Sequence, residues 1–191
     1  MVNLYRSKYN YNKCILFYCM TLKIQNYDLG VKILIPEIKH DDRGFVSEVF
    51  RTDWVEFFDG TFPKQVNLSM SKPGVIRAWH RHSRNQTDYF LVKKGKMKIC
   101  IYDDNEKSDT FGKLVEVFAG DDEIKIVKVP GHFWHGTQTI SDYPSETIYF
   151  LTNLYNYENP DEERLDWNDP SIIDPRTKTQ YDWNSHMRSP Q

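Results

Sequence analysis

The residues of this chain best suited to chemistry are histidines that gather in two short segments. His80 and His82 stand two positions apart, and His132 and His135 follow in a second segment. Alternate residues of a β-strand point to the same face, so His80 and His82 would leave a strand together. An imidazole has a pKa of about 6.5 and can exchange a proton near neutral pH. Two imidazoles inside a small β-fold are costly unless hydrogen-bonded, charged or bound to a metal, so the pair predicts a functional site.

The histidines belong to a series of β-branched and aromatic runs that turn residues separate. The runs cover residues 31–38, 45–50, 65–71, 75–82, 88–93, 96–102, 114–118, 123–129, 133–140 and 147–154. In one of them Lys96 and Lys98 alternate with Met97, Ile99 and Ile101, so the lysines and the apolar residues would point to opposite faces. Eight or more short strands at this spacing predict an all-β sandwich or barrel.

Composition sets the class of protein. The chain has 191 residues, of which 39% are hydrophobic and 27% are charged. This length predicts one domain with short additional segments. The net charge of −2 argues against a protein that coats nucleic acid polymers, and no apolar run is long enough for a membrane-spanning helix. Cys14, Cys19 and Cys100 form no C-x-x-C pair, so we expect a reducing cytoplasm rather than a disulfide framework.

Two segments resemble the motifs of the cupin superfamily. Gly74, His80, His82, Asp88 and Gly95 follow the order of the first cupin motif, and residues 130–135 are similar to the second. The resemblance implies a double-stranded β-helix jelly roll. We expect its barrel over residues 30–156, an N-terminal extension over residues 1–29, and a tail of short helices and loops over residues 157–191 that packs on the barrel.

A closer resemblance extends from about residue 30 to residue 172. Six pieces in the same order resemble the nucleotide-sugar 3,5-epimerases, typified by dTDP-4-dehydrorhamnose 3,5-epimerase. The pieces are residues 42–48, residues 67–80, residues 108–112, residues 130–136, the pair Tyr149 and Tyr155, and residues 167–170. The resemblance implies epimerisation of a nucleotide-linked 4-keto-6-deoxy sugar in deoxysugar and surface polysaccharide biosynthesis. It also implies a homodimer with exchanged N-terminal strands.

The chemistry of such a reaction requires three groups. A base removes the acidic proton beside the ketone, a cation or donor holds the enolate oxygen, and an acid returns a proton to the opposite face. The resemblance implies His80 as the base, Asp169 as the carboxylate that orients it, and Tyr149 as the acid. No cofactor is expected in this interpretation.

The resemblance also implies a set of substrate-binding residues. Arginine side chains suit a diphosphate because the guanidinium can donate two parallel hydrogen bonds. Arg77 and Arg43 would hold the charges of the substrate, with Arg77 nearer the sugar. The remaining expected binding residues are Gln65, Asn67, His135 and Tyr155.

The chain departs from the epimerase pattern at three positions. Ala78 stands where the family usually has Gly, and His82 stands where a Gln is common. Asp88 replaces the Lys that stabilises the enolate in the family. A carboxylate opposes a developing enolate, so either Arg77, His82 or His135 takes over that task, or the reaction differs.

Three alternatives follow from these departures. His80, His82, Asp88 and His135 occupy the four ligand positions of metal-binding cupins, and three imidazoles with a carboxylate suit one divalent transition metal. A nucleotide-sugar 3,4-ketoisomerase and a non-catalytic relative that binds a sugar nucleotide are the others. The direction of the Asp88 carboxylate separates these hypotheses: convergence with the three histidines favours a metal, and Asp169 behind His80 favours the epimerase.

Overall fold

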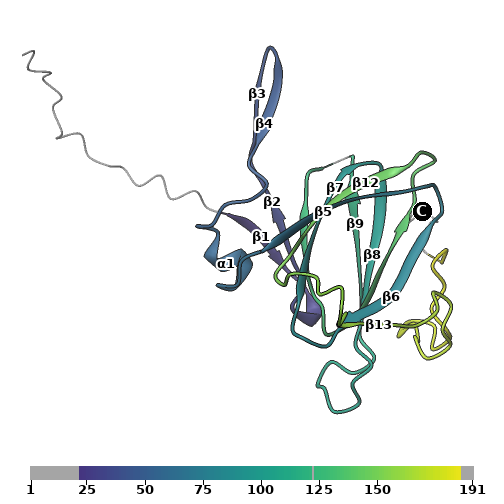
Figure 1. The fold of residues 1–191 in the computed structure, drawn as a ribbon. Coiled ribbons are helices and arrows are strands. Elements are labelled where there is room, and N and C mark those ends of the chain that lie inside the picture. The colour runs from purple at the N-terminus through teal and green to yellow at the C-terminus, as the bar shows by residue number, and fades with distance from the viewer. Residues whose placement is uncertain (1–21, 122, 186–191) are drawn as a thin grey trace, which may run out of the picture.

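The computed structural model describes residues 22–121 and 123–185, and it is built almost entirely of antiparallel strands (Figure 1). The larger sheet has the order β1 (Lys23–Asn26), β2 (Lys32–Ile35), β10 (Ile126–Pro130), β7 (Thr87–Lys94), β12 (Ser145–Leu151), β5 (Gln65–Ser71). The smaller sheet has the order β13 (Glu162–Arg164), β6 (Ile76–His82), β11 (Trp134–Thr139), β8 (Lys96–Tyr102), β9 (Leu114–Gly120). The all-β prediction is confirmed.

Few other elements accompany the two sheets. β3 (Ile38–Asp41) and β4 (Gly44–Ser47) form a hairpin that projects away from the barrel (Figure 1). Within residues 22–121 and 123–185 the helices are η1 (Asp28–Gly30), a single 3₁₀ turn, and α1 (Val55–Phe58). None of the helices in the described residues has the length and apolar character needed to cross a membrane.

The two sheets face each other and enclose an apolar core. Strands of both sheets contribute to it because every second residue of each strand points inward. The buried members are Leu29, Val31, Ile33, Phe90, Val92, Met97, Ile99, Ile101, Val115, Val117, Ala119, Val127 and Val129. Tyr149 is partly buried against this core. The interior is therefore packed with side chains over much of its length, and a site can form only where polar residues replace them.

The outer face of each sheet is also covered. α1 packs Phe57 and Phe58 against Tyr89 and Leu91 of β7 on the outside of the larger sheet. The C-terminal tail covers the smaller sheet, where residues from both form one apolar cluster: Trp79, Cys100, Tyr102, Trp134, Ile172, Tyr181 and Trp183.

This tail changes the environment of Lys98. Its side chain faces away from Met97 and Ile99, as the alternation predicts, but it is fully buried rather than solvated. Its ammonium donates a hydrogen bond to the backbone carbonyl of Trp183 and lies near the ring of Tyr181. Burial lowers the pKa of Lys98.

We expect Trp183→Ala to destabilise the fold by about 3–5 kcal/mol, because its indole is fully buried and contacts Trp79 and Tyr181. Urea unfolding followed by circular dichroism measures the loss. Tyr157→Ala is the matched control, since this ring is 86% exposed, and should cost less than about 0.5 kcal/mol. Equal effects of the two substitutions would contradict the role of the tail as a cover for the smaller sheet.

Part of the expected N-terminal extension belongs to the larger sheet. Residues 1–21 lie outside the described residues, so the expected extension and strand exchange stay predictions. Residues 23–26 of the expected extension form β1, which pairs with β2 of the same chain.

Candidate functional site

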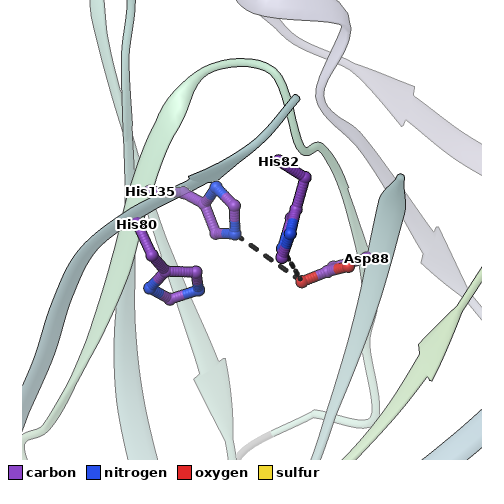
Figure 2. A group of neighbouring side chains, drawn as sticks. All are labelled: His80, His82, Asp88 and His135. Carbon is purple, nitrogen blue, oxygen red and sulfur yellow. Dashed lines mark ion pairs between the residues drawn. The ribbon is translucent and has the colours of Figure 1, made fainter. Parts of the chain in front are cut away.

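Four polar side chains meet between the two sheets, where the apolar core ends. His80 and His82 come from β6 and His135 from β11 in the smaller sheet, while Asp88 comes from β7 in the larger one. Figure 2 shows the four side chains converging, and the potential ligand atoms lie within 4.8 Å of one another. We call these four residues the His–Asp cluster. The expectation that His80 and His82 share an inner face agrees with this convergence.

A β-bulge in β6 brings Arg77 to the same side as His80. His80 pairs with His135 and Arg77 pairs with Thr137, so three steps on β6 match two on β11. Ala78 and Trp79 both pack on the outer cluster, and the extra residue restores Arg77 to the inner side. The Arg77 guanidinium donates to the buried Ser71 hydroxyl at 2.8 Å.

Gly136 leaves room for this bulge. A Cβ atom on Gly136 would lie 2.2 Å from the Cβ atom of Ala78 and 3.0 Å from the backbone oxygen of Arg77. Any side chain there would push apart the pair of strands that carries His80 and His135.

We therefore expect Gly136→Ala to cost about 1–3 kcal/mol of stability, measured by urea unfolding, through overpacking at the bulge. Ala78→Gly removes the nearest atom and should recover part of that cost. A double-mutant cycle gives the coupling between the two positions. Strictly additive effects would contradict the contact as the source of the loss.

Oxygen atoms outside the His–Asp cluster lie beside Nδ1 of two of its imidazoles. The Nδ1 atom of His135 lies 2.9 Å from the backbone oxygen of Phe133. The Nδ1 atom of His82 lies 3.4 Å from Oδ1 of Asp161, in the tail. Both Nε2 atoms then point inward, and each lies 3.6 Å from Oδ2 of Asp88.

Gln86 closes the cluster on one side. Its amide nitrogen donates to Oδ1 of Asp88 at 2.8 Å and lies 3.1 Å from Nε2 of His82. Gln86 is buried, so this amide holds the carboxylate and the ring in fixed positions.

Burial and neighbouring groups shift the pKa values of three residues in the cluster. Burial, followed by the neighbouring His135, holds the pKa of His80 well below its ordinary value, so this imidazole is neutral near pH 7. Burial opposes a charge on His82, but contacts with Asp88 and Asp161 raise its pKa. Burial likewise opposes ionisation of Asp88, but the adjacent imidazoles of His135 and His82 hold its pKa far below the ordinary value. The cluster thus contains a neutral base beside a buried carboxylate.

Three of the expected binding residues are joined in one chain of hydrogen bonds. Gln65 donates to the side-chain oxygen of Asn67 at 3.0 Å and accepts from the backbone N–H of Tyr155 at 2.9 Å. Gln65 and Asn67 stand on the inward-facing side of β5. The neighbouring β12 presents Tyr149, whose ring stacks on Phe90 with 5.9 Å between the ring centroids.

A family model described as dTDP-4-dehydrorhamnose 3,5-epimerase matches residues 28–180. This chain belongs to the dTDP-4-dehydrorhamnose 3,5-epimerase family. The match covers both sheets from β2 onward, the His–Asp cluster and most of the tail. The resemblance of the sequence to this family is confirmed.

Relatives of this epimerase family chain include proteins of glycan and polysaccharide biosynthesis. The chain is 42% identical over 161 residues to the probable low-salt glycan biosynthesis epimerase Agl13 of Haloferax volcanii, covering 84% of this chain and 96% of the relative. It is 34% identical over 161 residues to the spore coat polysaccharide biosynthesis protein SpsL of Bacillus subtilis, covering 83% and 98%.

A solved structure of the family has the same fold. The epimerase RmlC from Legionella pneumophila, in complex with dTDP-4-keto-L-rhamnose, superposes with a TM-score of 0.69 at 29% identity, covering 79% of this chain and 81% of that chain. The predicted cupin jelly roll is confirmed by this likeness.

Two expected site residues of this family member have their hydrogen bonds and ion pairs with residues outside the cluster. Asp169 accepts hydrogen bonds from the backbone N–H and the hydroxyl of Ser171, and within residues 22–121 and 123–185 no hydrogen bond or ion pair joins it to His80. Arg43 sits at the turn of the projecting hairpin, where it pairs with Asp41 and its side chain is 84% exposed.

Gln86 and Asp161 are site residues that the sequence did not single out. Gln86 lies two residues before Asp88, so its place in the same segment could have pointed to it. Asp161 stands in the polar tail, just before the short strand β13 that pairs with β6. No spacing in the sequence connects it to His82.

Proposed function

We propose that this protein epimerises a nucleotide-linked 4-keto-6-deoxy sugar at C3, C5 or both, as a step in making a rhamnose-type deoxysugar for a surface polysaccharide or glycan. One observation carries the proposal: the imidazole of His80 is neutral and lies between the two sheets, with Arg77 on the same side of β6. The printed names of Agl13 and SpsL support the glycan context.

His80 is the proposed base of this reaction. Protons on C3 and C5 are acidic because the C4 ketone can accept the electron pair as an enolate. A neutral imidazole has a free lone pair for such a proton, and the lowered pKa of His80 keeps that lone pair available near pH 7. Asp169 accepts both hydrogen bonds from Ser171 with Oδ1, so it would orient His80 through its other oxygen, Oδ2.

Tyr149 is the proposed acid. It stands on the larger sheet, whose inner face lies across the barrel from the sheet that carries His80. A phenol on the opposite face of the sugar would deliver the proton that inverts the carbon. Transfer of protons beside a ketone requires no organic or redox cofactor.

The proposed substrate contacts come from residues on the inward-facing sides of the strands. Arg77 would donate to the phosphates or the sugar, with Ser71 holding its guanidinium. Gln65, Asn67 and Tyr155 would bind the nucleotide as the connected group described above. His135 would contact the sugar from β11.

Conversion of a dTDP-4-keto-6-deoxy sugar tests the proposal. The purified protein should produce a sugar with inverted C3, C5 or both, seen by nuclear magnetic resonance of the product. Formation of a 3-keto sugar would show a ketoisomerase instead. Binding with no change in the sugar over a wide range of enzyme concentrations would show a non-catalytic relative.

We also propose a homodimer in which β5 and the projecting hairpin contact a second copy. β5 is the edge strand of the larger sheet, and its outward residues Val66, Leu68 and Met70 are 54–70% exposed. Phe45 and Val46 of the hairpin are similarly exposed, at 61% and 65%. An apolar face along an unpaired strand edge favours association with another chain. Arg43 at the hairpin turn would then reach the partner rather than its own cluster.

Leu68→Glu is expected to convert the dimer into monomers, because a carboxylate in an apolar interface would be desolvated without a partner. Light scattering coupled to size-exclusion chromatography measures the mass. Phe111→Glu is the control, since this ring is 52% exposed in the loop between β8 and β9, outside the proposed contact. A wild-type protein that is already monomeric at tens of micromolar would contradict the proposed dimer.

The cytoplasm is the proposed compartment. Cys100 is a free thiol buried under the tail, where burial raises its pKa to about 12 and keeps it unreactive. Cys14 and Cys19 lie outside the described residues.

A further inference from the structure

We propose that His82, Asp88 and His135 bind one divalent transition metal ion, with His80 beside the ion. The proposal goes beyond the epimerase function, because a metal site can exist whether or not the protein turns over a sugar. It rests on the direction, spacing and burial of the side chains in the His–Asp cluster.

The spacing within the cluster fits a shared ion better than direct hydrogen bonds. The Nε2 atoms of His82 and His135 each lie 3.6 Å from Oδ2 of Asp88. This distance exceeds the ~3.2 Å limit of a good N–H···O hydrogen bond. Two ligand atoms ~2.1 Å from one tetrahedral ion lie about 3.4 Å apart. The two nitrogen–oxygen separations therefore match those between ligands of one ion, and all the potential ligand atoms lie within 4.8 Å of one another.

The outer contacts prepare both imidazoles for ligation. Nδ1 of His135 lies 2.9 Å from the carbonyl oxygen of Phe133, and Nε2 of His82 lies 3.1 Å from the amide nitrogen of Gln86, which can only donate, so the proton of each neutral ring belongs on Nδ1. Nδ1 of His82 makes no hydrogen bond within the described residues, and the Asp161 carboxylate lies 3.4 Å from it. Both Nε2 lone pairs then face Asp88. An imidazole held by a carbonyl or a carboxylate through its far nitrogen is the usual arrangement of a metal-binding histidine.

The inward Nε2 atom of His135 has no hydrogen-bond partner among the described residues, and the Asp88 carboxylate beside it is buried. His135 is fully buried, and its Nε2 atom makes no hydrogen bond within the described part of the chain. The Asp88 side chain is 5% exposed. Two lone pairs and a carboxylate that face one another in a buried site are costly, and a cation among them removes that cost.

The donor set selects the class of ion. Two imidazole nitrogens and one carboxylate oxygen suit Zn²⁺, Fe²⁺, Co²⁺, Mn²⁺ or Ni²⁺, whereas Mg²⁺ and Ca²⁺ prefer oxygen ligands throughout. Three protein ligands leave at least one position open. If the proposed function holds, that position can accept the ketone oxygen of the substrate and stabilise the enolate as a Lewis acid.

Metal content tests the site directly. Protein purified without chelator should contain about one transition metal ion per chain by inductively coupled plasma mass spectrometry. After removal with a chelator, Co²⁺ should bind with visible absorption bands, and Zn²⁺ should compete with it. A wild-type protein that neither retains nor binds any of the five ions would overturn the proposal.

Matched variants locate the ion. His135→Asn should abolish Co²⁺ binding, whereas His132→Asn, which changes an exposed histidine three residues away, should leave it unchanged. Asp161→Asn removes the carboxylate beside Nδ1 of His82 with almost no change in side-chain size, and it should weaken Co²⁺ binding ~10–100-fold. Unchanged binding in both His135→Asn and Asp161→Asn would place the ion elsewhere and overturn the proposal.

The two proposals fail separately. Bound metal without sugar epimerisation would support the metal site and contradict the proposed function. Epimerisation at full rate by metal-free protein would support the proposed function and contradict a catalytic role of the ion. Co²⁺ binding would still show whether the metal site exists.

Discussion

His80→Asn is expected to slow epimerisation of a dTDP-4-keto-6-deoxy sugar by about 10²–10⁴-fold, the usual contribution of a positioned general base. The asparagine amide fills part of the space of the imidazole but cannot accept a proton near neutral pH. No side-chain hydrogen bond acts on the His80 imidazole within the described residues, so a ring nitrogen is available to the substrate. The rate of product formation under saturating substrate measures the effect.

The control for this prediction is His132→Asn. His132 is exposed and contacts Phe133 rather than the cluster, so this variant should keep its rate within about threefold of the wild type. Circular dichroism and Co²⁺ binding show whether His80→Asn retains the fold and the metal site. A folded His80→Asn protein with the wild-type rate would exclude His80 as the base.

Tyr149→Phe is expected to separate proton removal from inversion. His80 could still take the proton and return it to the same face, so deuterium from heavy water would enter the sugar without a change of configuration. The formation of inverted product should fall about 10²–10⁴-fold, because the acid on the opposite face is lost. Nuclear magnetic resonance reports both processes in one sample.

The ring of Tyr149 packs on Phe90, and phenylalanine preserves this contact, so the substitution leaves the core intact. Tyr157→Phe is the control and should alter neither process, since Tyr157 is 86% exposed. Wild-type inversion by Tyr149→Phe would show that another group delivers the proton.

Strands with strong alternation could be located from the sequence. β5 and β8 begin and end at the residues expected, because apolar and polar residues alternate and turn residues bound them. β13 could not be located, because its three charged residues form a strand only by pairing with β6. The burial of Lys98 could not be predicted either, since it depends on tail residues more than 80 positions away.

The site could be predicted only where its geometry is local. His80 and His82 share a face because they stand two apart on one strand. Strict alternation would put Arg77 on the other face, and only the bulge at Ala78 and Trp79 reverses this. The approach of Asp88 to the histidines is a contact between sheets, for which a single sequence contains no spacing.

Asp88 connects the proposed function with the proposed metal site. We expected its convergence with the histidines to favour a metal, and the convergence is present. The family match favours an epimerase. The proposed metal site within an epimerase-family barrel would account for both observations, and it would give the carboxylate a role as a ligand.

The measurement that tests the central claim most directly is incorporation of deuterium into a dTDP-4-keto-6-deoxy sugar incubated with the wild-type protein in heavy water. We predict deuterium at C3, C5 or both, with inversion at the labelled carbon and a rate that depends on His80. Complete recovery of unlabelled sugar at high enzyme concentration, with the sugar nucleotide bound, would contradict epimerisation by this protein.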